Sequence, residues 1–176
     1  VSCVYLRQPD TLGLGHAVLC AQPLINNEAF AVLLADDLID STIPCLKQML
    51  AIYQEKQSTI IAVQATSPEE SEQYGIIGYK VKTGRLSQIN NIIEKPSHKE
   101  APSNLAVVGR YILNSTIFPY LSTTAVGKGG EIQLTDAIAR QLQDEIMHAW
   151  EFEGVRYDCG SKLGYLKATI AFALKH

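Results

Sequence analysis

One continuous apolar run does most to constrain the fold of this chain. Residues 29–34 read Ala-Phe-Ala-Val-Leu-Leu, which is the length of a strand. An unbroken run of this kind is typical of a strand buried on both faces of a parallel sheet, because a half-buried strand alternates apolar and polar side chains. The run stops at Asp36 and Asp37, so two carboxylates are expected where the strand ends.

The segments around this run alternate between strand and helix patterns. The expected elements are a strand at 4–6, a helix at 16–25, a helix opening near Pro44 and a strand at 58–64. This order predicts an α/β sheet with right-handed crossovers, in which ligands bind beyond the carboxyl ends of the strands. Asp36 and Asp37 fall at one such end.

The second half of the chain predicts a hairpin followed by mixed elements. The expected strands are 78–82, 85–93, 105–113 and 147–151, and the expected helices are 115–121 and 135–143. Ser161 is expected to cap a final helix with one apolar face, formed by Leu163, Leu166, Ile170 and Leu174. Two loops are expected at 96–102 and 123–130.

Composition excludes several classes of protein. With 176 residues, 47% hydrophobic and 19% charged, the chain fits one domain or most of one and does not resemble a disordered chain. A net charge of −3 without a basic block argues against a nucleic acid polymer as partner. Four scattered cysteines predict buried free thiols in a reducing cytosol. The sequence has no signal peptide and no apolar run long enough to indicate a membrane span.

Several acidic residues are candidates for metal or phosphate chemistry. Asp36 and Asp37 directly after an apolar strand are costly unless water, a partner or a metal compensates, and Mg²⁺ prefers such ligands. A solvated turn or a helix cap is the alternative. Asp158 precedes a Gly-Ser helix start, which is also a common capping arrangement. Lys162 in the first turn opposes the helix dipole, so either a bound anion or a nearby carboxylate compensates, or the side chain is simply exposed.

Two further motifs are weaker. Glu94 and Lys95 end a strand before Pro96, and alternation lets only one face a pocket unless the backbone twists; a surface pair is the alternative. The loop at 8–15 carries Gly13 and Gly15, which allow close backbone approach to a flat ligand, but it has neither dinucleotide-binding nor P-loop spacing. His16 is expected to be structural, and no nucleophile elbow favours a hydrolase.

Taken in order, these weak signals resemble a known family. The stretches that carry the resemblance are RQPDTLGLGHAVLCAQPLI, FAVLLADDLI, QYGIIGY, IIEKP, VVGRYIL, GKGGEIQLTDAI and YDCGSKLGYL. As a set they closely resemble the bacterial UTP–glucose-1-phosphate uridylyltransferases, within the sugar nucleotidyltransferases. The resemblance implies a Rossmann-like α/β fold with a mixed, mostly parallel central sheet flanked by helices. It makes residues 1–176 the carboxy-terminal part of a single nucleotidyltransferase domain.

The same resemblance implies an activity and its components. The family transfers a uridylyl group from UTP to glucose 1-phosphate, giving UDP-glucose and pyrophosphate, with Mg²⁺ as cofactor; the enzyme is expected to be a cytoplasmic homo-oligomer. The implied catalytic residues are Asp36, Lys95 and Asp158, of which Asp36 and Asp158 are the metal ligands. The implied substrate-binding residues are Gln8, Gly13, Asp37, Gly75, Glu94, Gly109, Glu131 and Lys162.

The roles differ within this set. Gln8 and Gly13 correspond to the pair that reads the uracil edge, Glu94 accepts hydrogen bonds from the sugar, and Lys95 holds the sugar phosphate. Glu131 is placed near the sugar pocket or at a subunit contact. Ala35 stands where the family is expected to have Pro or Gly, which should alter the turn only slightly.

One departure from the family is large. The family's glycine-rich triphosphate loop and its first strand would precede Val1, which has no initiator methionine before it. A molecule that begins at Val1 is expected to be inactive and poorly stable, whereas a molecule in which these segments precede Val1 is expected to be an intact enzyme. The alternatives are a related thymidylyltransferase or N-acetylglucosamine-1-phosphate uridylyltransferase, a non-catalytic nucleotide-sugar-binding protein, and an inert truncation product.

Overall fold

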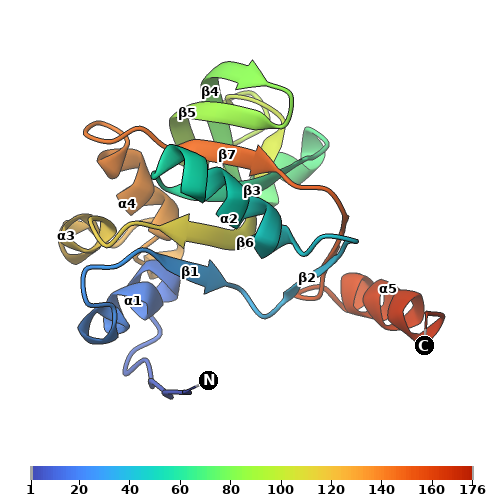
Figure 1. The fold of residues 1–176 in the computed structure, drawn as a ribbon, viewed down its shortest axis with the longest axis horizontal. Helices are drawn as coiled ribbons and strands as arrows, with labels where there is room; N and C mark the ends of the chain where they lie inside the picture. The colour runs from blue at the N-terminus through green and yellow to red at the C-terminus, as the bar shows by residue number, and fades with distance from the viewer. Residues whose placement is uncertain (1, 176) are drawn as a thin grey trace.

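A mixed six-stranded sheet forms the centre of the fold. The structure is a computed structural model and describes residues 2–175. The strand order is β1-β6-β3-β7-β5-β4, with an additional β6–β4 pairing. The strands are β1 (Phe30–Leu33), β3 (Ile60–Ala65), β4 (Gly75–Thr83), β5 (Leu86–Glu94), β6 (Leu105–Leu113) and β7 (His148–Glu151). A second, two-stranded sheet pairs β2 (Asp37–Asp40) with β8 (Val155–Asp158) (Figure 1).

Helices cover both faces of the large sheet. The α-helices are α1 (Gly13–Cys20), α2 (Cys45–Lys56), α3 (Ile117–Thr123), α4 (Leu134–Gln141) and α5 (Lys162–Ala173), and the short 3-10 helices are η1 (Gln22–Leu24), η2 (Glu69–Gln73) and η3 (Lys128–Gly130). Figure 1 shows α2 crossing one face of the sheet. There Met49 packs with Ile60 and Ala62 of β3, while Ile61 and Val63 of the same strand pack with residues of α1, α3 and α4 on the other face.

The α/β fold with a mixed sheet is confirmed, but the prediction of mostly parallel pairing is wrong. Among the strands of residues 2–175, only β3 and β7 pair in parallel, with Ile60 opposite His148. β6 pairs antiparallel with both β1 and β3, so those two strands share a direction although they are not neighbours. β6 separates them because the later part of the chain inserts between strands that are linked by α2.

The apolar run at residues 29–34 contains β1, which is an edge strand of the large sheet. β1 pairs with β6 along one side, and Ala31 and Leu33 are exposed, Leu33 by 51%. The prediction that this strand is buried on both faces is therefore wrong in the part of the chain that the structure describes. β3 is the strand with that property, since Ile60 to Val63 are all fully buried.

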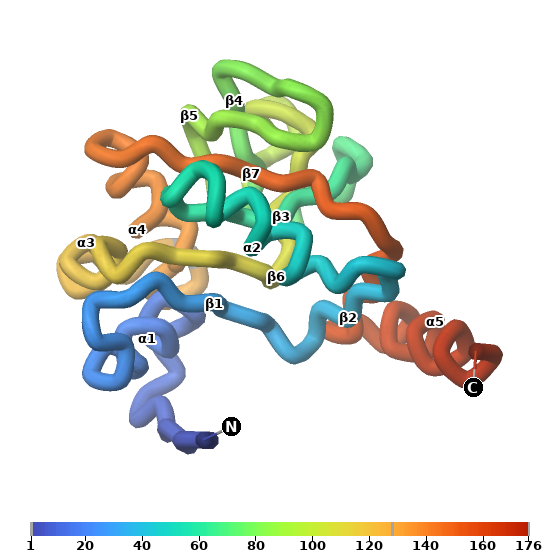
Figure 2. Tube along the Cα trace, viewed as in Figure 1, coloured from blue at the N-terminus to red at the C-terminus, as the bar shows by residue number. Residues whose placement is uncertain are grey.

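The amino-terminal segment and the last helix depart from the packed body. The expected strand at 4–6 is not formed, and Tyr5 is 95% exposed, because no described strand lies beside it to complete its hydrogen bonds. Ser161 caps α5 as predicted, its Oγ accepting from Gly164 N at 3.0 Å. Figure 2 shows α5 extending away from the body, and the side chains of its apolar face, Leu163, Leu166, Ile170 and Leu174, are exposed.

Two chemical expectations concern the whole described chain. All four cysteines are free thiols as predicted, but the prediction that they are buried holds for Cys45 alone: Cys3 is exposed, and Cys20 and Cys159 are partly exposed. Among residues 2–175, no helix combines the length and apolar character that crossing a bilayer requires.

Candidate active site

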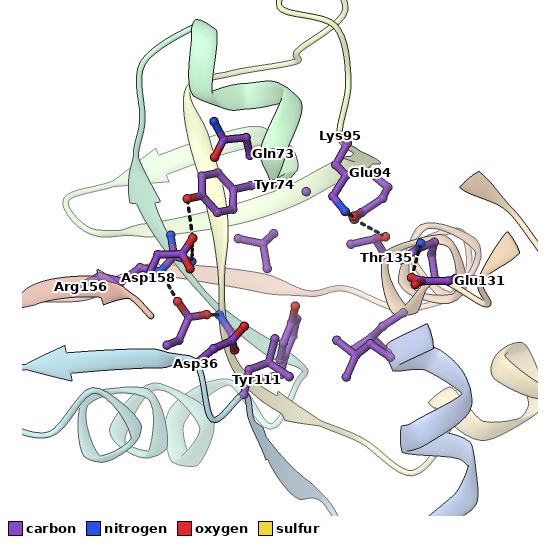
Figure 3. A pocket seen from close by; sticks show the side chains of 18 residues that line it. Asp36, Gln73, Tyr74, Glu94, Lys95, Tyr111, Glu131, Thr135, Arg156 and Asp158 are labelled. Atoms are coloured by element: carbon purple, nitrogen blue, oxygen red, sulfur yellow. Dashed lines mark hydrogen bonds and ion pairs between the residues drawn. The ribbon is translucent and has the colours of Figure 1, made fainter. Parts of the chain in front are cut away.

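A pocket of about 440 Å³ gathers most of the candidate residues (Figure 3). It lies where the end of β1, the β2–β8 pair, the middle of β6, the junction after β5 and the start of α4 meet. Eight residues singled out in the sequence line it: Asp36, Asp37, Gly75, Glu94, Lys95, Gly109, Glu131 and Asp158. Gln8, Gly13 and Lys162 do not belong to the lining.

The β2–β8 pair brings the two predicted metal ligands together. In its register Asp37 stands opposite Asp158, and Cys159 N donates to Asp36 O at 2.7 Å. A Cβ placed on Gly160 would lie 3.1 Å from Asp158 Oδ1 and 3.2 Å from Asp36 Oδ2. Both carboxylates therefore border the same small space, which exists because residue 160 has no side chain.

Asp37 is engaged by the protein on both carboxylate oxygens. Gly109 N donates to Oδ2 at 2.6 Å, and Arg156 forms an ion pair with Oδ1; the Arg156 and Asp37 side chains are 7% and 6% exposed. A Cβ at Gly109 would stand 2.4 Å from Asp37 Oδ2, so glycine is required there to let the backbone reach the carboxylate. Asp37 and Gly109 thus build the wall of the pocket, while Asp36 remains exposed toward its opening.

Arg156 and Tyr74 complete this wall, and neither was identified from the sequence. Tyr74 Oη donates to Asp158 Oδ2 at 2.8 Å, and Arg156 Nη2 lies 3.4 Å from the same oxygen. The guanidinium lies 4.7 Å from the centre of the Tyr74 ring. Burial, and then the hydrogen bond to Asp158, raises the pKa of the Tyr74 hydroxyl, so it remains a donor. The strand alternation of Arg156 and Asp158 was the available signal for Arg156.

Glu94 and Lys95 both line the pocket because the backbone turns between them. Lys95 has φ of +45°, a left-handed conformation that is uncommon outside glycine. Strand alternation would point Glu94 and Lys95 to opposite faces, so both can face the pocket only if the backbone twists, and the conformation of Lys95 supplies that twist. Thr135 Oγ1 donates to Glu94 Oε2 at 2.8 Å, and Lys95 Nζ lies 3.8 Å from Glu94 Oε1. A Cβ on Gly75 would come within 3.2 Å of Glu94 Oε2, so Gly75 keeps space beside that carboxylate.

The loop before α1 lies next to the pocket. Gln8 Nε2 donates to Gly13 O at 3.1 Å and lies 3.0 Å from His16 Nδ1, so the structure brings the predicted uracil-reading pair together. Gly13 has φ of +87°, and a Cβ there would stand 2.6 Å from Glu131 Cβ. Gln133 Nε2 donates to Glu131 Oε2 at 3.1 Å. The loop is therefore packed against the Glu131 segment that lines the pocket.

Lys162 is not brought to this pocket. It is exposed in the first turn of α5. Of the alternatives for this residue, the exposed side chain is the one that the fold favours, and a role in substrate binding has no support from its position.

Comparison with known proteins then decides the family. A profile described as nucleotidyl transferase matches residues 1–173. The chain belongs to the nucleotidyltransferase family. Among curated relatives, it is 48% identical over 171 residues to UTP–glucose-1-phosphate uridylyltransferase 2 of Staphylococcus saprophyticus, a match that covers 97% of this chain and 59% of the relative. The enzyme of Staphylococcus epidermidis is 46% identical over the same shares. The chain spans about three-fifths of the length of these relatives.

Solved structures of the family agree with this assignment. A UDP-glucose pyrophosphorylase complexed with UDP-glucose superposes with a TM-score of 0.95 at 46% identity, over 98% of this chain and 66% of that one. The UTP-bound enzyme of Acinetobacter baumannii has a TM-score of 0.90 at 42% identity, over 100% of this chain and 61% of that one. A glucose-1-phosphate thymidylyltransferase from Bacillus anthracis, at 22% identity and a TM-score of 0.73, shares the fold alone.

The nucleotidyltransferase pocket contains two carboxylates that could hold a divalent cation. Among residues 2–175, no cluster of three or more histidine, cysteine, aspartate or glutamate side chains is placed to hold a metal ion. Asp36 and Asp158 nevertheless face one space, and Mg²⁺ is commonly held by one or two carboxylates together with waters and substrate phosphates. Asp158 Oδ1 also accepts from Gly160 N at 3.0 Å, which fixes the carboxylate while leaving lone pairs for a cation. The two carboxylates therefore fit a site that a phosphate ligand completes.

Proposed function

We propose that this protein acts in the transfer of a uridylyl group from UTP to glucose 1-phosphate, which yields UDP-glucose and pyrophosphate. The observation that carries the proposal is that one pocket holds both groups of residues. Asp36 and Asp158 border a shared space on one side, and Glu94, Thr135 and Lys95 form the opposite wall. Support also comes from the relatives named as uridylyltransferases and from the solved relative complexed with UDP-glucose. Residues 1–176 would form the carboxy-terminal part of one nucleotidyltransferase domain.

The proposed reaction needs no protein nucleophile. A phosphate oxygen of glucose 1-phosphate attacks the α-phosphorus of UTP in line; a new O–P bond forms as the bond to the β-phosphate oxygen breaks, and pyrophosphate leaves. Because the attacking phosphate is already ionised, catalysis rests on positioning and on charge neutralisation. The Lys95 ammonium would hold the sugar phosphate, and Glu94, oriented by Thr135, would accept hydrogen bonds from sugar hydroxyls.

The remaining residues would position the nucleotide and a cation. Gln8 and Gly13 would read the uracil edge from the loop before α1. Asp36 and Asp158 would hold Mg²⁺, which when bound supplies positive charge to the phosphates. Tyr74 and Arg156 would keep the Asp158 carboxylate in place. A divalent cation is general in this family, and Mg²⁺ is the ion that the two carboxylates best suit.

Further proposals concern the setting of the reaction. UTP, glucose 1-phosphate and UDP-glucose would be the small-molecule partners, with no nucleic acid polymer and no membrane. Four free thiols are consistent with the predicted cytoplasmic location. A homo-oligomer stays a prediction, which sedimentation velocity of the purified protein would test.

Binding and turnover test different parts of this proposal. Isothermal titration with UDP-glucose tests the sugar, uracil and cation half of the site, and pyrophosphate release from UTP and glucose 1-phosphate tests the whole reaction. We expect UDP-glucose to bind in the presence of Mg²⁺ and more weakly after chelation with EDTA. Asp36→Asn should abolish the response to Mg²⁺, whereas Asp10→Asn, at an exposed loop position, should not.

Two outcomes would reject the assignment. A protein that binds no UDP-glucose with Mg²⁺ present lacks the proposed site. Turnover of dTTP without turnover of UTP would favour the thymidylyltransferase alternative instead. The non-catalytic alternative is disfavoured because both Asp36 and Asp158 are retained, and equal activity of Asp36→Asn and the parent would disprove the proposed cation site.

A further inference from the structure

The turn that carries Asp36 is held by a residue outside the pocket. Ala35 and Asp36 form the turn between β1 and β2, and both are exposed, so burial of their side chains does not fix the turn. The hydrogen bond that closes the turn is long, since Asp37 N lies 3.4 Å from Leu34 O. A carboxylate on such a turn needs another group to fix its position.

Arg110 on β6 supplies that group. Its Nη1 donates to Leu34 O and to Gly109 O, each at 2.8 Å, and its Nη2 donates to Asp37 O. A guanidinium is a planar fork of donors with fixed geometry. One side chain therefore spans both ends of the turn and ties them to β6.

Arg110 does this from the face of the sheet opposite the pocket. Val108 and Ile112, two positions to either side on β6, pack with α2, whereas Gly109 lines the pocket. Burial raises the pKa of Cys45, and the charge of Arg110 opposes this effect, which places the guanidinium near the start of α2. Among residues 2–175, Arg110 neither lines the pocket nor forms an ion pair. Holding the turn is therefore the role that its contacts support.

We propose that Arg110 is a positioning residue for the divalent cation, because by fixing the turn at 34–37 it holds the Asp36 carboxylate at the space shared with Asp158. The inference rests on the proposed function, in which these two carboxylates hold Mg²⁺. Arg110 touches neither substrate nor cation and acts through the backbone of the turn. Removal of groups that orient a metal ligand typically lowers metal affinity about ten- to a hundredfold.

The sign of the effect separates positioning from electrostatics. A guanidinium near a cation site repels the cation, so removal of its charge alone would tighten cation binding. Removal of a positioning contact weakens cation binding, because the released turn must be ordered again when the cation binds. Arg110→Met removes both the charge and the hydrogen bonds and keeps the aliphatic stem. Weaker binding by this variant therefore identifies the positioning role.

The test is the binding of Mn²⁺ to Arg110→Met and Arg110→Lys, followed by electron paramagnetic resonance. We expect the affinity for Mn²⁺ to fall at least about tenfold in both variants. Lysine should not restore it, because a single ammonium lacks the fork that spans both ends of the turn.

Isothermal titration adds a measurement that does not depend on how much of a variant is folded. The quantity is the ratio of UDP-glucose affinity in Mg²⁺ to UDP-glucose affinity in EDTA, measured on one sample. The ratio should fall in Arg110→Met, whereas the affinity in EDTA should match that of the parent. A general loss of structure would lower both affinities together.

Arg140→Met is the matched control. Arg140 donates to Tyr120 O at 3.2 Å and to the hydroxyls of Thr123 and Thr124, and it lies outside the pocket. This change also removes the hydrogen bonds of one guanidinium to a neighbouring segment. It should lower the melting temperature and leave both the Mn²⁺ affinity and the UDP-glucose ratio unchanged.

Each outcome decides a different claim. If the parent shows the Mg²⁺ effect and Arg110→Met binds Mn²⁺ as tightly as the parent or more tightly, the Arg110 inference is wrong and the proposed function stands. Parent-like binding by Arg110→Lys, or an equal loss in Arg140→Met, overturns the inference in the same way. If the parent binds no Mn²⁺ and its UDP-glucose affinity does not depend on Mg²⁺, the proposed cation site fails and this inference fails with it.

Discussion

The backbone at Lys95 gives the sharpest test of how this site is built. Lys95 has φ of +45° and is followed by Pro96, whose ring favours an extended conformation for the residue before it. A left-handed conformation costs a non-glycine residue about 1–2 kcal/mol. The conformation is held because Lys95 N donates to Tyr74 O at 3.0 Å and because Pro96 is buried. The protein therefore accepts local strain at the residue that is proposed to hold the sugar phosphate.

Comparing Lys95→Gly with Lys95→Ala separates strain from chemistry. Glycine relieves the strain but raises the entropy of the unfolded chain, which offsets about 0.4–1 kcal/mol. The glycine variant should then be more stable than the alanine variant by about 0.5–1 kcal/mol, or a rise in melting temperature of about 1–4 °C for a chain of this size. Both variants lose the ammonium, so both should bind glucose 1-phosphate about ten- to a hundredfold more weakly, as expected for a charge-assisted hydrogen bond.

Urea unfolding and isothermal titration measure the two quantities independently. Gln57 is the matched control, because it has φ of +49° at the end of α2 and lies outside the pocket. Gln57→Gly should exceed Gln57→Ala in stability by a similar margin, with no change in ligand affinity. Equal stability of the two Lys95 variants would refute the strain, and unchanged affinity in both would refute the role of the ammonium.

Three further expectations follow from the same contacts. Arg156→Met leaves a buried carboxylate without its ion-pair partner and should cost about 3–5 kcal/mol in urea unfolding. Lys56→Met removes the exposed pair with Glu55 and should cost less than about 1 kcal/mol. Gly160→Ala places a methyl group between two carboxylate oxygens, and electron paramagnetic resonance should show weaker Mn²⁺ binding with little loss of stability. Burial raises the pKa of Cys45 to about 11, from a reference of 9.0, so the folded state holds that proton more tightly than the unfolded chain. Its contribution to stability should be lost between about pH 9 and 11, and iodoacetamide at pH 8 should modify exposed Cys3 far faster than Cys45.

Strong periodicity explains what was predictable in the fold. The strand at 105–113 was predicted with the bounds of β6, and the helix opening at Pro44 was found as α2, because long apolar patterns report which face is buried. They do not report direction, so the antiparallel insertion of β6 was missed. β2 and β8 were missed for another reason. Each has four residues of mixed polarity and is defined only by pairing with a segment distant in the chain.

In the site too, local sequence patterns identified candidate residues, but contacts between segments distant in the chain could not be predicted. The sequence identified Asp36 and Asp158 as candidates, but only the β2–β8 pairing shows that they border one space. Arg156 was missed because its contribution depends on Asp37, a residue from the other end of the chain. Lys95 was singled out from the sequence and lines the pocket, yet strand alternation alone placed its side chain on the opposite face from Glu94. A single residue with positive φ reverses that expectation.

Asp36 and Asp37 differ in their pairing, and this difference determines the charge of the pocket. Arg156 neutralises Asp37, so that pair contributes structure and little net charge. Of the charged groups that line the pocket, the carboxylates of Asp36, Glu94, Glu131 and Asp158 then face a single further cation, Lys95. Such a surface repels the phosphates of a nucleotide sugar unless positive charge is added beside it. The charge balance of the pocket therefore supports the proposal of Mg²⁺ at Asp36 and Asp158, in addition to the placement of these two carboxylates.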